Sequence, residues 1–366
     1  MAKADDIVRY GLIGTGMMGT EHLWNLQHLD GAVVTAVADP NPGMLDWIVE
    51  AAGPDGPSLV RFADHNDLLD SGLVDAVVVA SPNHTHLDVM LDVLARPAVH
   101  VLVEKPLCTT VADCRTLIDA AAGRPGLVWV GLEYRYMPPV ARLVDEVRAG
   151  TVGTPRMVAI REHRYPFLNK VDDWNRFNRN TGGTLVEKCC HFFDLMNHIL
   201  GERPVRVLAS GGQDVNHLDE SYHGETPDIL DNAFVIVDYP SGARALLDLC
   251  MFADASHNQE ELSVVGDRGK VEAFLPSCEL RWTERVKGGL GLHQEVVEDA
   301  DIAYQGFHHG SSFLEHRDLL DAIRTGGSAK VEVDDGLWSV AVGVAAHRSI
   351  DEGRAVTLDE VLAPSP

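Results

Sequence analysis

A glycine-rich segment near the start of the chain constrains the fold more than any other feature. Gly14-Thr15-Gly16-Met17-Met18-Gly19 follows an apolar run at 7–14 and precedes a helix-like pattern at 20–29. In this context G-x-G-x-x-G allows a tight turn, close approach of the backbone to a pyrophosphate, and close helix–strand packing. The N–H groups that begin the helix favour phosphate. We therefore expect these six residues to bind a dinucleotide; the alternative is a plain turn.

Asp39 indicates which dinucleotide is bound. It lies 20 residues after Gly19, at the end of the second strand-like run. A carboxylate there accepts hydrogen bonds from the adenosine ribose and repels a 2′-phosphate. The next residues, Pro40-Asn41-Pro42, include no lysine or arginine to hold that phosphate. The sequence predicts NAD rather than NADP, and the alternative is that Asp39 caps a turn.

The rhythm of apolar runs predicts two domains, as does the length of 366 residues. Strand-like runs first alternate with helical patterns, which predicts a doubly wound parallel sheet over residues 1–125. Later strands are longer and follow one another directly, which predicts an α+β domain with an open, mostly antiparallel sheet over residues 126–366. The helix expected at 337–352 is a candidate to pack back on the first domain. The early runs are 7–14, 33–39, 59–62, 74–80, 99–104 and 127–131; the later ones are 155–165, 205–211, 232–239, 243–250, 262–266 and 269–274.

The charge and the cysteines exclude several classes of protein. The chain has 55 acidic against 30 basic residues, a net charge of −25, which disfavours nucleic acid and membrane surfaces as partners. Its six cysteines form no C-x-x-C pair, a pattern typical of reduced thiols in the cytoplasm. Neither these cysteines nor the histidine pairs, His84/His86 and His308/His309, make a convincing metal site, so we expect no metal.

Lys105 is the first candidate for chemistry. It follows an apolar strand-like run and precedes a proline, which places it at the carboxyl end of a parallel strand, where such sheets bind ligands. A lysine there could hold a substrate hydroxyl beside the nicotinamide and accept its proton. The alternatives are a surface lysine for Lys105 and a loop-orienting role for its neighbour Glu104.

A second group of titratable residues follows a Gly182-Gly183 pair. Glu187 and His191 are four residues apart and share a face if the segment is helical. Histidine suits proton transfer near neutral pH, and a carboxylate could orient it. Asp194 lies on roughly the same face, and Lys188 is a weaker candidate to bind substrate. The alternative is a structural network at a helix start.

Other polar residues could line a site for a polyhydroxylated ring, which needs hydrogen-bond partners and an apolar surface. We expect Arg135, His163, Asp173 and Trp174 to bind substrate, and one residue of the His308-His309 pair to enter the site. The alternative for all of them is a solvated loop.

Three motifs in order resemble one protein family. They are Val77-Val78-Val79-Ala80-Ser81-Pro82-Asn83-His84-Thr85-His86, then Glu104-Lys105-Pro106-Leu107, then the segment from Gly182 to Asp194. Together they resemble the glucose–fructose oxidoreductase, inositol dehydrogenase and MocA family, from about residue 6 to about residue 360.

The resemblance implies a Rossmann domain and an α/β domain whose open sheet often mediates dimers or tetramers. It implies that residues of the first two motifs contact the cofactor: Ser81, Pro82, Asn83, His86, Glu104 and Lys105. The family's catalytic lysine falls on Lys105, and its Asp-x-x-x-His pair falls on Glu187 and His191. Glu187 departs from the family's aspartate, so it either takes part in catalysis or orients Lys105 or His191.

We therefore expect an NAD-dependent dehydrogenase that oxidises a secondary hydroxyl of a cyclic polyol, an inositol or a pyranose, with Lys105 and His191 as the proton relay. The expected assembly is a homodimer or homotetramer. One alternative is a redox-assisted glycosidase or lyase that holds NAD tightly. Another is a non-enzymatic sensor of sugar or NAD.

Overall fold

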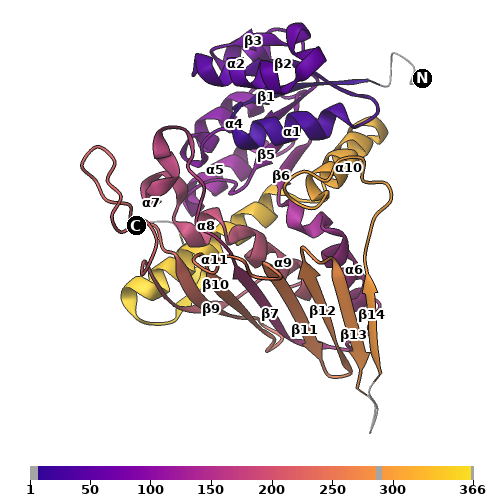
Figure 1. Ribbon diagram of the computed structural model, residues 1–366, viewed down its shortest axis with the longest axis vertical. Helices are drawn as coiled ribbons and strands as arrows, with labels where there is room; N and C mark the ends of the chain where they lie inside the picture. The colour runs from indigo at the N-terminus through magenta and orange to yellow at the C-terminus, as the bar shows by residue number, and fades with distance from the viewer. Residues whose placement is uncertain (1–6, 286–290, 364–366) are drawn as a thin grey trace. The chain divides into compact units, whose positions relative to one another are not determined.

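The computed structural model describes residues 7–285 and 291–363. The chain divides into two compact units, one containing residues 1–133 and 301–337 and the other containing residues 134–300 and 338–366. Each unit is built on one sheet (Figure 1). The fold is α/β, with a parallel Rossmann sheet in the first unit and a mixed sheet in the second.

The sheet of the first unit has the strand order β3-β2-β1-β4-β5-β6, all parallel. The order reverses between β1 and β4, and ligands bind at the carboxyl ends of strands beside such a reversal. Strands β4, β5 and β6 are valine-rich and almost wholly buried, as expected where both faces are covered, whereas the edge strand β3 is mostly exposed. The strands are β1 Val8–Ile13, β2 Ala32–Ala38, β3 Val60–Phe62, β4 Ala76–Val79, β5 His100–Glu104 and β6 Val128–Gly131; the helices are α1 Met17–Gln27, α2 Pro42–Ala51, α3 His65–Asp70, α4 His86–Leu94, α5 Val111–Ala121 and α10 Ser311–Thr325.

The sheet of the second unit has the order β14-β13-β12-β11-β7-β10-β9-β8-β15. The pair β7–β10 is parallel and the other pairs are antiparallel. Its strands are β7 Pro155–His163, β8 Arg206–Gly212, β9 Asn232–Asp238, β10 Arg244–Cys250, β11 Glu260–Gly266, β12 Gly269–Leu275, β13 Glu279–Glu284, β14 Leu292–Val296 and β15 Val356–Thr357. Its helices are α6 Pro138–Arg148, α7 Asn178–Thr181, α8 Thr184–Glu187, α9 Cys190–Leu200, most of α11 Val333–Glu352, and α12 Leu358–Leu362. Short 3₁₀ turns of the two units lie at Gly53–Ser58, Asn83–Thr85, Glu133–Tyr136 and Val171–Arg176.

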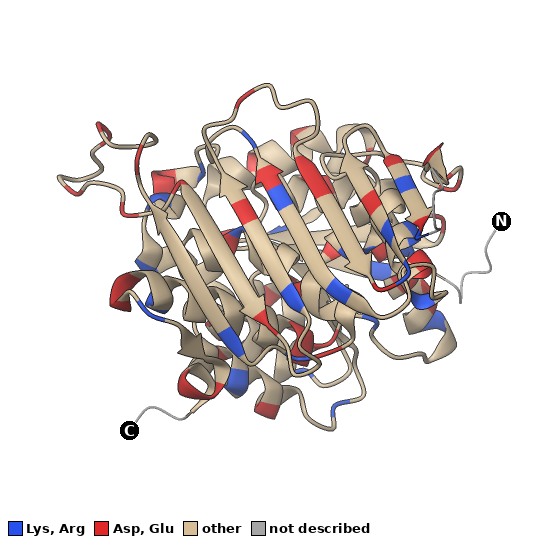
Figure 2. Cartoon of the chain, turned by 90° about the horizontal axis from the view of Figure 1, so that it is seen from below, with Lys and Arg blue, Asp and Glu red and all other residues tan. Residues whose placement is uncertain are grey.

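The two faces of this second sheet differ. Along β7, Val158 and Ile160 are buried under helices, whereas Met157 and Arg161 point to the other face and are exposed. Figure 2 shows that outer face, with charged residues gathered on some strands and few on others. This alternation decides which residues of each strand can reach a buried site.

The division of the chain differs from the one expected. Strand β6 pairs with β5 in the register Val103 to Val130, so the first unit runs past residue 125 to residue 133. The segment that returns to the first unit is 301–337, and most of the expected helix 337–352 belongs to the second. The reason lies in contacts of the returning segment: Trp129 donates a hydrogen bond to Glu315 (3.1 Å), and Val130 N–H donates to the carbonyl of Val331 (3.2 Å). Among the described residues, no helix combines the length and apolar character needed to cross a membrane.

Candidate functional site

The glycine-rich loop has the backbone conformations that a dinucleotide requires. Gly14 has a φ of +89°, and a Cβ there would lie 2.6 Å from the backbone nitrogen of Ser81. A Cβ on Gly19 would lie 2.1 Å from the carbonyl oxygen of Gly14, so strand and helix approach closely. At Gly16 a Cβ would meet no atom of the described residues within 4 Å, and the start of α1 has no side-chain cap. The loop and helix start therefore fit a pyrophosphate.

Asp39 is oriented by this loop. The N–H and the hydroxyl of Thr15 both donate to Asp39 Oδ2, at 2.9 and 3.1 Å, and the N–H of Asn41 donates to Oδ1 at 2.9 Å. A carboxylate has enough lone pairs to accept further hydrogen bonds from a ribose. The arrangement therefore fits NAD, with Met17 exposed and Met18 half-buried beside the loop.

The segment after β4 holds four of the expected cofactor residues, Ser81, Pro82, Asn83 and His86. The Ser81 hydroxyl accepts a hydrogen bond from Thr85 at 2.8 Å, and Pro82 follows it. Asn83 is buried, and its Nδ2 has no acceptor among the described residues, so a bound group could satisfy it. His86 is fully buried between the carbonyl oxygens of Ser81 (3.0 Å) and Pro106 (2.8 Å) and supports the loops from behind. Burial lowers the pKa of His86.

Glu104 ends the neighbouring strand, β5, and Lys105 follows it. The buried Glu104 carboxylate accepts a hydrogen bond from the backbone N–H of Lys105 at 3.1 Å, and its other oxygen lies 2.8 Å from Nε2 of His22. Lys105 is half-buried. The sequence therefore placed Lys105 at the carboxyl end of the sheet but gave no sign of His22.

His308, one of the two histidines of which we expected one to enter the site, lies close to two glutamates of the first unit. Its Nδ1 is 3.6 Å from Oε1 of Glu21 and 3.9 Å from Oε1 of Glu133, the residue that follows β6 by two positions. Burial raises the pKa of the Glu133 carboxyl. His309 has a φ of +55°, and burial lowers its pKa. His308 is thus the member of the pair that contacts carboxylates of the first unit.

The second unit gathers a separate cluster around Lys188. Its ammonium donates to the Tyr134 hydroxyl at 2.7 Å and pairs with Oε1 of Glu162 at 3.0 Å. The Tyr134 ring stacks on the His191 imidazole, with centroids 4.0 Å apart and planes 7° apart. All four residues are buried. Lys188 therefore fixes Tyr134, and Tyr134 fixes the plane of the His191 ring.

Glu187 and His191 do not lie on one continuous helix. Helix α8 ends at Glu187 and α9 begins at Cys190, with a turn between them. Helix α8 itself follows Gly183, whose φ is +90° and where a Cβ would lie 2.3 Å from Nε2 of His347. That nitrogen accepts a hydrogen bond from the N–H of Leu185 at 3.1 Å, and burial lowers the pKa of His347 to about 4.

Arg135, which was expected near the substrate, pairs with Asp194. The Arg135 Nε donates to Oδ2 of Asp194 at 2.6 Å, and its Nη2 donates to Oδ1, a bidentate pair that is almost wholly buried. The Arg135 guanidinium is therefore occupied by Asp194, and this pair connects the 3₁₀ turn at Glu133–Tyr136 to α9.

The other expected substrate residues lie at the end of β7 and in a short turn. His163 lies on the outer face of the sheet, 3.0 Å from Asp248, because it is out of phase with the buried residues Val158 and Ile160. Asp173 and Trp174 are half-buried in a 3₁₀ turn, where Asn169 donates to Asp173 at 3.0 Å. We therefore leave His163 out of the proposed site.

Two buried glutamates beside Lys188 were not expected. Glu162 and Glu260 lie opposite each other on β7 and β11, and Arg164 also pairs with Glu162 at 3.3 Å. Burial, and then the charge of Glu162, raise the pKa of Glu260 to about 7. The sequence held a signal for Glu162, which alternates in phase with Val158 and Ile160.

Comparison with known proteins finds relatives that are similar to this chain over nearly its whole length. A myo-inositol 2-dehydrogenase of Thermotoga maritima is 28% identical over 359 residues, covering 97% of this chain and 100% of the relative. An inositol 2-dehydrogenase of Rhizobium meliloti is 26% identical over 351 residues, covering 96% and 99%. The crystal structure of a probable dehydrogenase from Thermotoga maritima is 27% identical, with a TM-score of 0.77, and the match covers 97% of this chain and 100% of that one.

Two family models divide the chain between them. Residues 8–132 match the NAD-binding Rossmann fold of an oxidoreductase family, and residues 144–358 match the C-terminal alpha/beta domain of the same family. The boundaries agree with the strands of the two sheets. The chain therefore belongs to the glucose–fructose oxidoreductase, inositol dehydrogenase and MocA family of NAD-binding oxidoreductases.

Proposed function

We propose that this NAD-dependent oxidoreductase oxidises a secondary hydroxyl of a cyclic polyol, an inositol or a pyranose. The observation that carries the proposal is Lys105, placed at the carboxyl end of β5 in the unit that holds the glycine-rich loop and Asp39. The names of the relatives, inositol 2-dehydrogenases matched over almost their full length, support the substrate class.

In this proposal the bound NAD supplies the hydride acceptor. Lys105 binds the substrate hydroxyl and takes its proton while hydride leaves the same carbon, so the alcohol becomes a ketone. His191 passes the proton on, held in plane by Tyr134, and Glu187 orients it. Lys188 is neutralised by Glu162 and acts through Tyr134. In the second unit, Asp173 and Trp174 offer a carboxylate and an aromatic face to a sugar ring.

A substrate panel tests the class. Inositols, pyranoses and anhydrosugars, with lactate, malate and simple alcohols as controls, are assayed for NADH formation and for product. We expect at least one cyclic polyol to yield NADH in equal amount to ketone, with strong selectivity for hydroxyl configuration. Product without NADH would instead indicate a redox-assisted glycosidase or lyase, and no turnover with bound sugar would indicate a sensor. A carboxylic acid without a ring as best substrate contradicts the proposal.

Lys105→Met tests the relay. We expect turnover to fall by about 10²–10⁴-fold with NAD affinity almost unchanged, because the variant removes a general base and leaves the glycine-rich loop intact. Lys330→Met is the matched control, since Lys330 is an exposed lysine of the same unit that pairs with Asp318. Near-normal turnover of Lys105→Met would remove this lysine from the mechanism.

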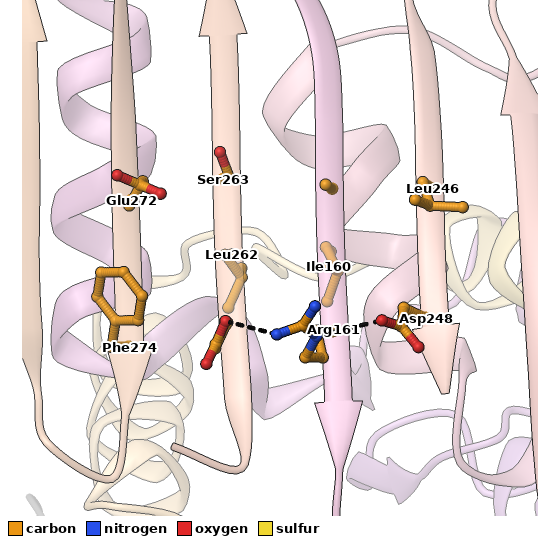
Figure 3. Close-up of a pocket in the computed structure, with 10 residues that line it drawn as sticks. Ile160, Arg161, Leu246, Asp248, Leu262, Ser263, Glu272 and Phe274 are labelled. Carbon is orange, nitrogen blue, oxygen red and sulfur yellow. Dashed lines mark hydrogen bonds and ion pairs between the residues drawn. The ribbon is translucent and has the colours of Figure 1, made fainter. Parts of the chain in front are cut away.

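We also propose a homodimer or homotetramer that pairs the outer faces of the second sheet. Met157 and Phe234 on this face are each 60% exposed. Arg161 lies between Asp248 and Glu261, at 3.1 and 3.3 Å, beside a depression of about 140 Å³ (Figure 3). Apolar side chains beside charge pairs suit contact with a second copy.

Light scattering after size exclusion tests this assembly. We expect the parent to elute as a dimer or tetramer and Phe234→Asp to dissociate at micromolar concentration. Trp47→Asp, an exposed aromatic of the first unit, is the control and should not change the mass. A monomeric parent, or a Phe234→Asp variant that keeps the parent's mass, contradicts the proposed interface.

A further inference from the structure

Three buried groups in the first unit form a hydrogen-bonded chain to which the proposed reaction gives no role. His22 on α1 places Nε2 2.8 Å from Oε1 of Glu104 and Nδ1 2.8 Å from Nε2 of His316 on α10. The exposed fractions are 1% for His22, 0% for His316 and 5% for Glu104. The second oxygen of Glu104 accepts the N–H of Lys105. The chain of contacts therefore ends at the lysine of the proposed relay.

The geometry assigns the protons along this chain. His22 Nε2 faces a carboxylate, so it carries a hydrogen. His316 Nδ1 is buried and has no hydrogen-bond partner among the described residues. A buried N–H without an acceptor costs more than a bare lone pair, so the His316 proton sits on Nε2 and points to His22. The direction of donation is thus from His316 to His22 and from His22 to Glu104.

The charges follow from these contacts. Burial lowers the pKa of His316 well below its ordinary value, so this ring is neutral. Burial opposes the ionisation of Glu104, but the hydrogen bond from His22 and the charges of Lys105 and His308 outweigh it and lower the pKa of Glu104 to about 2. Glu104 is therefore a carboxylate throughout the working pH range.

We propose that His22 and His316 are positioning residues for Lys105, acting through Glu104. They hold the carboxylate ionised with one oxygen on His22, so that its other oxygen fixes the Lys105 backbone and its charge stabilises the Lys105 ammonium. The proposal rests on the proposed function only in calling Lys105 the proton acceptor. Other titratable groups near these residues include Glu133, which follows β6, and His308 with its partner Glu21. His86 feels the charge of Glu104, and the buried Tyr10 ring packs edge-on against His316.

Loss of the donor should therefore change the basicity of Lys105. Without His22 the buried Glu104 takes up a proton more readily, and the ammonium loses a neighbouring anion. We expect His22→Ala and Glu104→Gln to lower the pKa of Lys105 by about half a unit or more. His22→Gln, whose amide can still donate to Glu104, should restore most of the difference, and His316→Leu should give a smaller shift.

The test measures this pKa without turnover. The holoprotein is labelled with trace acetic anhydride over a range of pH, and acetylation of Lys105 is quantified by mass spectrometry against the exposed Lys330. His65→Ala, a change to a half-buried histidine of the same unit that pairs with Asp92, is the control and should leave the curve unchanged. Circular dichroism and NAD binding identify variants that fail to fold; Glu104→Gln, which keeps the shape, remains decisive if His22→Ala fails.

The outcomes separate the two proposals. A Lys105 curve that shifts in Glu104→Gln and His22→Ala and returns in His22→Gln supports the inference, and the acid limb of kcat/KM should shift in parallel. Curves that superimpose on the parent overturn it, even if Lys105→Met is inactive. Shifted curves in a protein whose turnover survives Lys105→Met leave the inference standing and refute the proposed relay.

Discussion

At the scale of single residues, Tyr134 shows how one side chain can act through two contacts. Its hydroxyl accepts a hydrogen bond from Lys188, and its ring lies flat on His191. The ring contact restricts the imidazole to one plane, whereas the hydroxyl contact holds the ring. The two contacts can be removed separately.

Tyr134→Phe and Tyr134→Ala should therefore differ in kcat. Phe keeps the stacked ring and should cost at most about tenfold, whereas Ala releases His191 and should cost about 10²-fold, because misplacing a catalytic group by about 1 Å has that effect. Steady-state kinetics with the best polyol measures the difference. Equal losses in the two variants would show that the hydroxyl, and not the ring, matters.

Glu260 should make stability depend on pH. Its pKa of about 7 when folded lies above that of an unfolded glutamate, so the folded protein holds a proton that the unfolded chain has lost. The stability that Glu260 contributes is present below about pH 4.5 and is lost as pH rises to about 7. The loss in the free energy of unfolding is up to about 3 kcal/mol. Urea unfolding at pH 5 and pH 8 should show this loss in the parent and not in Glu260→Gln. The control Glu261→Gln, on the outer face beside Arg161, should follow the parent.

At the scale of elements, the connection between α8 and α11 positions Glu187. Helix α8 has only four residues, so its own hydrogen bonds stabilise it little. The Leu185 N–H instead finds its acceptor on His347 of α11. This contact needs a neutral imidazole, since a protonated nitrogen cannot accept.

Protonation of His347 should therefore lower the stability of the second unit at acid pH. Its folded pKa of about 4 lies below the usual 6.5, so the stability it contributes is present above pH 6.5 and is lost as pH falls to about 4, at most about 3 kcal/mol. Thermal unfolding monitored at pH 7 and pH 4.5 should show a smaller drop in His347→Gln, whose amide oxygen can still accept from Leu185. A parallel drop in both proteins would contradict this assignment.

The sequence predicted where the strands lie better than it predicted which of their side chains point inward. The apolar runs of the first unit became strands, because parallel strands must be apolar on both faces, and 33–39 corresponds to Ala32–Ala38. His163 was expected at the substrate because of its chemistry, yet strand alternation directs Glu162 inward instead. Nothing local revealed where α8 begins, because the acceptor of the Leu185 N–H is His347, far along the chain.

At the scale of the whole molecule, the first unit is assembled from two separate parts of the chain. Residues 301–337 supply His316, Glu315 and the carbonyl of Val331 to contacts with residues before 134. A domain boundary read from the rhythm of strands could not include this return, because hydrogen bonds between distant segments leave no periodic signal in the sequence.

A fragment that joins 7–133 to 301–337 through a flexible linker should bind NAD and unfold cooperatively. Residues 7–133 alone should do neither, since the buried Trp129 and His22 would lose their partners Glu315 and His316. A fragment that joins 7–125 to 301–337 lacks β6 and should also fail. Calorimetric titration with NAD and urea unfolding measure both properties, and tight NAD binding by 7–133 alone would contradict this view.

The contact between His22 and His316 can form only late in the synthesis of the chain. The two residues are 294 positions apart. At the usual pace of translation, roughly 5–20 residues per second, about 15–60 s pass between their appearance on the ribosome. During that interval the nascent first unit exposes the apolar surface that α10 will cover, while most of the second unit emerges. The end of the sheet that carries Glu104 is therefore finished late, and a molecular chaperone that shields this surface would act before the last helices leave the exit tunnel.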